Sequence, residues 1–505
     1  MSGFAIAFGN PAREDVEKMM ETIDYRGPDA SGVVVSGKAA MAQNHLEADG
    51  LTGGDVPPLP PAADSRARTC YDGQMGNWPE LAGPRNISDG PLKEERLILD
   101  MYAEMGPGLL DHLGDTLFSF VISDGEKLLA ARDLLGIKTL FYGRKDGNIY
   151  LSQELKAVVQ ITDDVYEFPP GSYMDETGEI KQFASLPAEP PALTDKSVDQ
   201  MTADIRDIIH RSLRNRVDFS LPVSSLLSGG IDSSIIAYLT NKIYKEKFGD
   251  DAVLKTYSLG VGVSQDIINA RKVAEMIGSD HRELIVDIEQ LMEVMPKVVY
   301  YLESFDPSLV RSSVSNYLIT RKAAEDGAKI LMSGEGGDEV FCGYIYLKDY
   351  PYEKQFEQQV RCLGFLHSNA SLRLDRMNQC NGVKVVAPMI SGELLNYALA
   401  IPPKYKQYPG DNGEKMEKYI LRKAFENDLP KDVVWRLKQE FSQGSGSADV
   451  VPKYIDDKIS DEELAEAQQK YPVVRSKEEL YYFKIFAENF GDSKAADTVG
   501  QWVSL

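Results

Sequence analysis

The sequence predicts two domains: an α+β sandwich of antiparallel strands, followed by an α/β domain with a doubly wound parallel sheet and a helical C-terminal part. The chain has 505 residues, more than a single domain usually holds. Residues 1–185 show short alternating strands broken by turns, whereas from about residue 198 apolar strands alternate with helical segments. We therefore place the two domains at 1–190 and 198–505.

In the first domain, alternation of apolar and polar residues predicts the strands, and 3.6-residue periodicity predicts one helix. The expected strands are Gly32–Val35, Leu117–Ile122, Lys127–Ala131, Thr139–Tyr142 and Asn148–Ser152, and the expected helix is Lys93–Met105. A proline-rich stretch at Leu186–Thr194 then predicts the interdomain linker.

In the second domain, strands and helices alternate along the chain. The expected order is a helix at Met201–Arg214, a strand at Val223–Leu227, a helix at Ile235–Tyr244, a strand at Val253–Leu259, a helix at Ile267–Ile277 and a strand at Ile330–Met332. Such alternation is typical of a parallel sheet, because parallel strands need long crossovers that helices usually supply. The last third of the chain is mainly helical by pattern.

Composition excludes several classes of protein. The net charge is −23, which argues against a nucleic-acid or anionic-membrane partner. The four cysteines are scattered without CxxC spacing, so neither a disulfide framework nor a zinc site is expected. We find neither a signal-peptide pattern nor an apolar run long enough to span a bilayer, and expect a cytoplasmic protein that could form a homodimer.

The clearest chemistry lies at Leu226–Ser234, read Leu-Leu-Ser-Gly-Gly-Ile-Asp-Ser-Ser, between a strand and a helix. Gly229 and Gly230 allow a tight turn close to a ligand, and the new helix offers free N–H groups to an anion. Ser228, Ser233 and Ser234 add hydroxyls, whereas Asp232 implies an intervening Mg²⁺ between carboxylate and phosphate. The string resembles the pyrophosphate-binding loop of N-type ATP pyrophosphatases, which implies cleavage of ATP between its α and β phosphates.

A second loop, Ser333–Glu339, is rich in glycine and follows the strand at Ile330–Met332. In a doubly wound sheet it would lie at the same carboxyl edge as the first loop. Ser333 and Gly334 could then approach ATP, and Asp338 could share Mg²⁺ with Asp232. The alternative is a glycine-rich surface turn with solvated acids.

Ordered motifs over nearly the whole chain resemble class B, glutamine-hydrolysing asparagine synthetases. In the second domain they are Lys255–Gly260, Leu302–Ser313, Ser333–Tyr344, Glu417–Phe425, Trp435–Gly444 and Ser476–Tyr482. In the first domain they are Tyr25–Asp29, Arg132–Lys138, Ser152–Ala157 and Phe168–Gly171. The resemblance implies the four-layer αββα sandwich of N-terminal-nucleophile amidotransferases for the first domain and an ATP pyrophosphatase fold for the second.

The resemblance also implies roles for residues of the second domain. Leu226 and Leu259 would flank the adenine, and Lys438 would neutralise the α-phosphate and the oxyanion of acyl transfer. Glu335 would orient the incoming amine or take its proton. Arg311 and Asp306 would bind a substrate carboxylate. The alternative for Arg311 is a structural salt bridge, with Asp306 as a candidate partner, and the alternative for Lys438 is an exposed charge.

The glutaminase pocket expected in the first domain is altered at several positions. Ser2 stands where the family has its nucleophilic Cys, and His45 where it has Arg for the glutamine carboxylate. The family's Asn-Gly-Glu reads Asp72-Gly73-Gln74, and Glu94 falls near its glutamine-amine Asp. Some related hydrolases use Ser, but an ionised Asp72 could not donate to an oxyanion. We therefore interpret the glutaminase site as degenerate.

The sequence leaves three hypotheses. The first is an Mg²⁺- and ATP-dependent ligase that adenylates aspartate and amidates it with free ammonia. The second keeps this chemistry but uses another carboxylic acid or an organic amine, because the family's charged GVEARVPFLD-like segment reads Gly382–Ser391 here and an upstream Asp becomes Ala370. The third is a non-catalytic ATP-binding regulatory protein, which the retained Asp232, Asp338, Glu335 and Lys438 disfavour.

Overall fold

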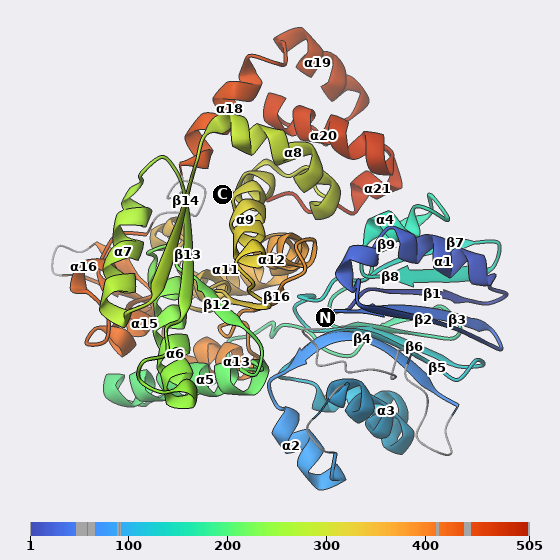
Figure 1. The fold of residues 1–505 in the computed structure, drawn as a ribbon, viewed down its shortest axis with the longest axis horizontal. Helices are drawn as coiled ribbons and strands as arrows, with labels where there is room; N and C mark the ends of the chain where they lie inside the picture. Colours follow the sequence, from blue (N-terminus) through green and yellow to red (C-terminus); the bar gives the residue numbers. More distant parts are fainter. Residues whose placement is uncertain are drawn as a thin grey trace. The chain divides into compact units, whose positions relative to one another are not determined.

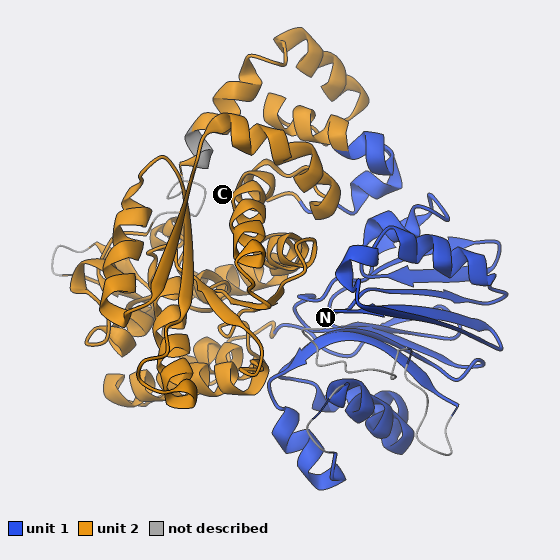
Figure 2. Cartoon of the chain, viewed as in Figure 1, with its two compact units in different colours: residues 1–186, 486–500 blue, residues 187–485, 501–505 orange. Residues whose placement is uncertain are grey.

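In the computed structural model, which describes residues 2–46, 58, 66–87, 90, 92–410, 414–438 and 446–502, the chain separates into two compact units. Residues 1–186 and 486–500 form unit 1, and residues 187–485 and 501–505 form unit 2 (Figure 2). Unit 1 is thus discontinuous in sequence. Gln439–Gly444, the end of one family motif, lies outside the described residues.

Unit 1 contains two antiparallel sheets. The six-stranded sheet has the order β2-β3-β1-β8-β7-β9, and the five-stranded sheet has the order β11-β10-β6-β5-β4. The strands are β1 Phe4–Phe8, β2 Ala30–Ser36, β3 Ala39–His45, β4 Arg68–Met75, β5 Thr116–Ser123, β6 Leu128–Arg132, β7 Phe141–Lys145, β8 Asn148–Ser152, β9 Val165–Glu167, β10 Ser172–Asp175 and β11 Ile180–Gln182. The β4–β5 pairing places Asp72 opposite Ser119.

Helices cover the outer face of each sheet of unit 1. α1 (Arg13–Glu21) packs on β1 and β3, and α4 (Leu155–Val158) packs on β7 and β8 (Figure 1). α2 (Trp78–Ala82) and α3 (Lys93–Met105) cover the other sheet, where α3 packs on β4. The two sheets bury one apolar core between them. This αββα order confirms the fold class predicted for the first domain; α21 (Lys494–Asp497) also belongs to this unit.

Unit 2 is built on a five-stranded parallel sheet of order β14-β13-β12-β15-β16. Its strands are β12 Val223–Leu226, β13 Lys255–Val261, β14 Asp280–Val286, β15 Ile330–Met332 and β16 Lys384–Val386. The order reverses direction at β12, as in a doubly wound sheet, so the predicted fold class is confirmed. The carboxyl ends of β12 and β15, which are hydrogen-bonded neighbours, lead into the two loops of interest.

Helices pack on the sheet of unit 2, with α7 and α9 on opposite sides of β13 (Figure 1). The first group is α5 Val198–Arg216, α6 Ile231–Phe248, α7 Gln265–Ile277, α8 Ile288–Leu302, α9 Pro307–Glu325, α10 Gly337–Val340, α11 Tyr352–Phe365 and α12 Ala370–Gln379. The remaining elements are α13 Gly392–Ala400, α14 Pro403–Lys406, β17 Gln407–Pro409, β18 Lys415–Glu417, α15 Tyr419–Phe425, α16 Lys431–Val434, α18 Ser447–Asp456, α19 Asp461–Lys470 and α20 Lys477–Phe490.

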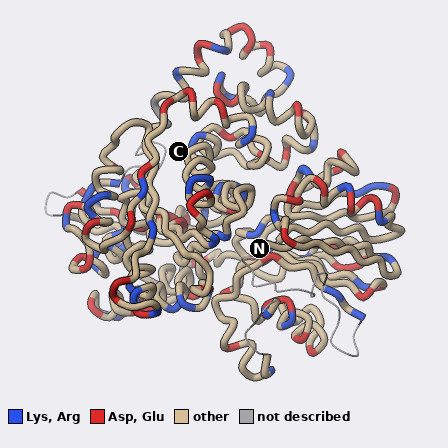
Figure 3. Tube along the Cα trace, viewed as in Figure 1, with Lys and Arg blue, Asp and Glu red and all other residues tan. Residues whose placement is uncertain are grey.

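Acidic and basic residues alternate along both units (Figure 3), so the excess of acidic residues is spread over the chain. In the part of the chain that the structure describes, every helix is too short or too polar to cross a bilayer.

Candidate functional site

The first loop joins β12 to α6 and is shaped for close approach to an anion. Gly229 has φ +76°, and a Cβ there would lie 2.5 Å from the Asp266 carbonyl oxygen, so only glycine fits. The Ser228 backbone N–H donates to Ser233 Oγ at 3.1 Å, and Ser234 Oγ donates to the Gly230 carbonyl at 2.7 Å. These bonds fix the turn while the first N–H groups of α6 point out of its N-terminus.

The second loop lies against the first. A Cβ on Gly334 would lie 2.5 Å from the Ser233 backbone nitrogen, and one on Gly337 would lie 2.5 Å from Asp232 Oδ1. Both positions therefore need glycine for the two loops to meet. The expectation that the loops share one sheet edge holds because β12 and β15 are parallel neighbours.

A cavity opens at this edge, and the structure brings most of the predicted site residues into its wall. They are Leu226, Ser228, Gly230, Asp232, Ser233, Leu259, Ser333, Gly334, Glu335, Asp338 and Lys438. Leu226 ends β12 and Leu259 lies in the neighbouring strand β13, so they can meet the two faces of one planar group. Ser234 and Gly229 shape the loop from behind rather than lining the cavity.

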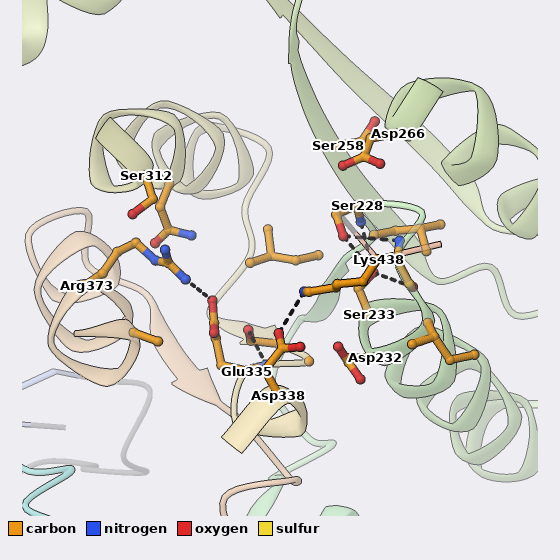
Figure 4. A pocket seen from close by; sticks show the side chains of 18 of the residues that line it. Ser228, Asp232, Ser233, Ser258, Asp266, Ser312, Glu335, Asp338, Arg373 and Lys438 are labelled. Carbon is orange, nitrogen blue, oxygen red and sulfur yellow. Dashed lines mark hydrogen bonds and ion pairs between the residues drawn. The ribbon is translucent and has the colours of Figure 1, made fainter. Parts of the chain in front are cut away.

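Asp232, Asp338 and Lys438 form the charged centre of the cavity (Figure 4), and Lys418 is buried against the two carboxylates. Lys438 Nζ lies 2.8 Å from Asp338 Oδ2. Lys418 Nζ lies 2.7 Å from Asp338 Oδ1 and also contacts Asp232, with its side chain fully buried. Burial alone would raise the pKa of Asp338, but the ammonium groups of Lys418 and Lys438 outweigh it and hold this pKa well below its ordinary value.

Asp232 and Asp338 fit a magnesium site. Mg²⁺ prefers oxygen ligands and commonly uses one or two carboxylates together with substrate phosphates and water. Asp232 Oδ1 is buried and has no hydrogen-bond partner among the described residues, so this oxygen remains available to a cation. Within the same described residues no group of three or more His, Cys, Asp or Glu side chains gathers as a self-contained metal site.

Glu335 points toward α12, where Arg373 holds it in an ion pair (Figure 4). The Glu335 side chain is 25% exposed, so it faces the cavity, whereas Arg373 is 8% exposed. Ala370, one turn earlier on α12, also lines the cavity.

Arg311 and Asp306 are not brought into this cavity. Arg311 Nη1 pairs with Glu478 at 2.6 Å, and Asp306 caps α9 by accepting from the Leu309 N–H at 3.0 Å. Asp306 also accepts from the Trp502 N–H at 3.0 Å. The salt bridge of Arg311 forms with Glu478 instead of Asp306, and the expected substrate-binding role of Arg311 and Asp306 stays a prediction.

The altered segment near residue 384 packs beneath the second loop. β16 pairs with β15, and the Ser333 N–H donates to the Val386 carbonyl at 2.9 Å. Met389 and Ile390 are buried, and Ile390 Cγ1 would lie 2.5 Å from a Cβ at Gly336. Apolar side chains thus support the second loop from below.

In unit 1, the Ser2 hydroxyl is buried and committed to two hydrogen bonds. It donates to the Tyr71 carbonyl at 2.8 Å and accepts from Gln43 Nε2 at 2.8 Å. Glu94, at the position expected to hold a glutamine amine, accepts from Tyr71 Oη at 2.6 Å and from the Met75 N–H at 3.1 Å. Ser2 and Glu94 are therefore both hydrogen-bonded within unit 1.

His45 and Asp72 are both buried in unit 1. Both ring nitrogens of His45 are buried without a hydrogen-bond partner among the described residues, and burial lowers the His45 pKa to about 3. A neutral imidazole cannot neutralise a glutamine carboxylate. Asp72 is buried and paired with Arg26 at 3.2 Å and with Lys138 at 3.1 Å, so it remains an acceptor where an amide donor would be needed; Gln74 is buried beside it on β4.

Lys418 and Arg373 are site residues that the sequence analysis did not assign. Lys418 sits inside the quoted motif Glu417–Phe425, and its φ of +54° is unusual for a residue with a side chain. A Cβ at Gly343 would lie 2.0 Å from Lys418 Cε, so Gly343 makes room for the lysine. The available signal was a charged residue before an apolar helix, which is too common to single out.

A Gly/Ser loop, an acidic second loop and two lysines at the edge of a doubly wound sheet define a nucleotide-binding domain of the ATP pyrophosphatase type. The asparagine synthase family model matches residues 204–361 and 350–501, and the glutamine amidotransferase domain model matches residues 1–177. The chain therefore belongs to the asparagine synthetase family, a family of ATP-dependent amide-forming ligases.

Two curated relatives agree with this assignment. The chain is 32% identical over 515 residues to asparagine synthetase B (glutamine-hydrolysing) of Escherichia coli, covering 96% of this chain and 90% of the relative. It is 29% identical to asparagine synthetase (glutamine-hydrolysing) 1 of Saccharomyces cerevisiae, covering 100% of this chain and 96% of the relative. A solved glutamine phosphoribosylpyrophosphate amidotransferase from B. subtilis is 12% identical at a TM-score of 0.33, covering 57% of this chain and 91% of that one.

Proposed function

We propose that this protein is an ATP- and Mg²⁺-dependent ligase that adenylates the β-carboxylate of aspartate and amidates it with free ammonia, without a working glutaminase. One contrast supports the proposal. The phosphate loops, Glu335 and Lys438 gather at one cavity. In contrast, the Ser2 hydroxyl and the Asp72 carboxylate are buried with partners inside unit 1, and the buried His45 imidazole is neutral.

In the first step, the aspartate β-carboxylate attacks the α-phosphate of ATP, forming an acyl-adenylate and releasing pyrophosphate. The loop Ser228–Ser234 and the N-terminus of α6 bind the pyrophosphate oxygens, and Leu226 and Leu259 enclose the adenine. Lys438 is held in its charged form, because Asp338 and Asp232 raise its pKa despite burial. Its ammonium can therefore neutralise charge that develops on the α-phosphate.

Asp232 and Asp338 would hold Mg²⁺, which supplies positive charge to the departing pyrophosphate when it is bound. Lys418 contacts both of these carboxylates and keeps them close together. The protein thus places two lysine ammonium groups and the metal ligands around the same phosphate position.

In the second step, ammonia attacks the acyl carbon and AMP leaves. Glu335 lies at the wall of the cavity and can accept the proton that the new ammonium must lose. Lys438 then stabilises the oxyanion of the tetrahedral intermediate. The buried wall of the cavity limits hydrolysis of the acyl-adenylate by excluding water.

The decisive experiment measures AMP and asparagine with aspartate, ATP and Mg²⁺, using ammonia or glutamine as the nitrogen source. We expect turnover with ammonia and none with ammonia-free glutamine. Asp338→Asn should abolish pyrophosphate release, whereas Asp461→Asn, at an exposed acid of α19, serves as the matched control. Equal turnover on glutamine would refute the proposed nitrogen source.

A second candidate keeps the adenylation but changes the acid or the amine. It is favoured by Ala370 in the cavity wall and by the apolar segment beneath the second loop. A panel of carboxylic acids with ammonia, and of amines with the best acid, scored by pyrophosphate release, separates the two candidates. A strong preference for aspartate with ammonia eliminates the second.

A further inference from the structure

We propose that Trp502 is a specificity-determining residue, whose indole ring limits the length of the acid that the cavity accepts. This inference rests on the proposed adenylation. Trp502 lines the cavity, although it lies just beyond residue 501, where the match to the asparagine synthase model ends. Hydrogen bonds hold its backbone and aromatic rings hold its side chain, so the indole is a fixed part of the cavity wall.

The backbone at Trp502 is bound to charged groups of unit 2. The Trp502 N–H donates to Asp306 Oδ2 at 3.0 Å, and Arg475 Nη1 donates to the Trp502 carbonyl at 3.2 Å. Arg475 Nη2 also lies 3.2 Å from Asp306 Oδ2, so one ion pair holds both sides of the residue. The preceding residue, Gln501, donates to Oε1 of the buried Glu479 at 2.9 Å. Asp306, Arg475, Glu479 and Gln501 are called the Trp502 anchor below.

Neighbouring aromatic rings fix the position of the indole. Its centroid lies 5.2 Å from that of Phe365, 5.8 Å from that of Tyr344 and 6.5 Å from that of Tyr346. The Tyr344 hydroxyl donates to the buried Glu339 at 2.6 Å, which holds this ring in place. Tyr344 also lines the cavity, so it forms an aromatic wall together with the half-buried indole.

The contacts of the indole place it at the end of the cavity that lies away from the first loop. Asp306 caps the start of α9, and Phe365 ends α11, shortly before α12 begins. Figure 4 shows Ser312 of α9 and Arg373 of α12 on the opposite side of Glu335 from the first loop. The aromatic wall therefore closes the end of the cavity that is bordered by these helices.

This wall sets a limit to the length of a bound acid. In the proposed reaction the carboxylate that is adenylated faces the α-phosphate, so the rest of the acid extends toward the indole. The face of an aromatic ring carries partial negative charge, so it does not attract a carboxylate. Because the indole is packed against three other rings, it also cannot move aside for an added methylene group. A pocket of fixed size discriminates against one extra methylene by roughly 10–200-fold.

The test is equilibrium binding of acids, measured by calorimetry on the full chain with Mg²⁺ and α,β-methylene-ATP. One series is aspartate, glutamate and 2-aminoadipate, and the other is propionate, butyrate and pentanoate, so each grows by one methylene at a time. We expect aspartate to bind at least about tenfold more tightly than glutamate, and Trp502→Ala to reduce this ratio at least about tenfold. Tyr408→Ala, at an exposed tyrosine of β17, is the matched control and should leave the ratio unchanged.

A second measurement tests the Trp502 anchor. Trp78→Phe with Trp435→Phe leaves Trp502 as the single tryptophan, so its emission reports binding at the wall directly. Gln501 is not part of the cavity wall, but Gln501→Ala removes one contact of the anchor. It should increase quenching of Trp502 by acrylamide and lower the ratio of aspartate to glutamate binding. Lower stability with an unchanged ratio would show that the anchor does not position the wall.

The outcomes separate this inference from the proposed function. Wild-type protein that binds no acid of either series, or binds short and long acids equally, overturns the inference, as does an unchanged ratio in Trp502→Ala. If Trp502→Ala does not fold, Trp502→Phe keeps the aromatic packing with a smaller ring and must lower the ratio. The proposed function fails by itself if Trp502 controls the ratio but aspartate yields no pyrophosphate with ATP. The inference fails by itself if aspartate yields pyrophosphate and the ratio does not depend on Trp502.

Discussion

His45 should make unit 1 acid-sensitive, and replacing it should remove that sensitivity. Its imidazole is fully buried, and burial lowers its pKa from the ordinary 6.5 to about 3. Between these two values the unfolded chain binds a proton that the folded chain cannot, so stability falls as pH falls below about 6.5 and the loss is complete near pH 3.

The magnitude follows from the two pKa values. At pH 5 the unfolded histidine is almost fully protonated and the folded one is not, which lowers the free energy of unfolding by about 2 kcal/mol relative to pH 8. His45→Leu removes the titrating group. It should also cost little at pH 8, because it replaces a buried ring whose nitrogens lack partners among the described residues by an apolar side chain.

The assay is urea unfolding at pH 5 and pH 8, followed by the fluorescence of Trp78, the tryptophan of unit 1, in a background of Trp435→Phe and Trp502→Phe. The difference between wild type and His45→Leu in the pH-induced change should be about 2 kcal/mol. His112→Gln, at an exposed histidine of the same unit, is the control. If wild type and His45→Leu lose the same stability between pH 8 and pH 5, His45 is not a buried neutral imidazole.

Three further predictions concern the two sites. Lys418→Met leaves two carboxylates without their buried cation, so unit 2 should lose about 3–5 kcal/mol in urea unfolding, and Mg²⁺ should restore part of it; unchanged stability would contradict the arrangement. Gly337→Ala places a methyl group 2.5 Å from Asp232 Oδ1 and should lower pyrophosphate release more than about tenfold, whereas the control Gly114→Ala meets open space. Ser2→Cys should not produce glutamate from glutamine, because His45 and Asp72 remain; measurable glutamate release would show that Ser2 is the decisive loss.

Much of the fold was predictable because its signals are local. The helix predicted at Lys93–Met105 and the strand predicted at Asn148–Ser152 have those bounds in the structure, since each carries its own periodicity. Boundaries shifted where neighbouring strands decide them: the strand expected at Thr139–Tyr142 is Phe141–Lys145, because pairing with β8 begins at Phe141. Hydrogen bonding to a partner strand, rather than local pattern, sets such an end.

In the candidate site, too, local features were predictable and long-range contacts were not. The phosphate loop is a contiguous strand, turn and helix, so residues 226–234 alone carry its chemistry. The ion pairs around it join residues far apart in sequence: Lys418 lies 186 residues from Asp232, and Arg311 lies 167 residues from Glu478. No local pattern states which of several charges will meet, which is why Arg311 was given the wrong partner and Lys418 was not assigned.

By itself, the sequence determined the two fold classes and the position of the Gly/Ser loop, and it predicted that Ser2, His45 and Asp72 alter a glutaminase pocket. The tertiary structure decided what surrounds these residues. It buried His45 away from a hydrogen-bond partner among the described residues, tied Asp72 to Lys138 and joined Glu335 to Arg373. The physical reason is that the residue type fixes the functional group of a side chain. The charge state of that group and its freedom to bind a ligand depend on burial and on partners that only packing brings together.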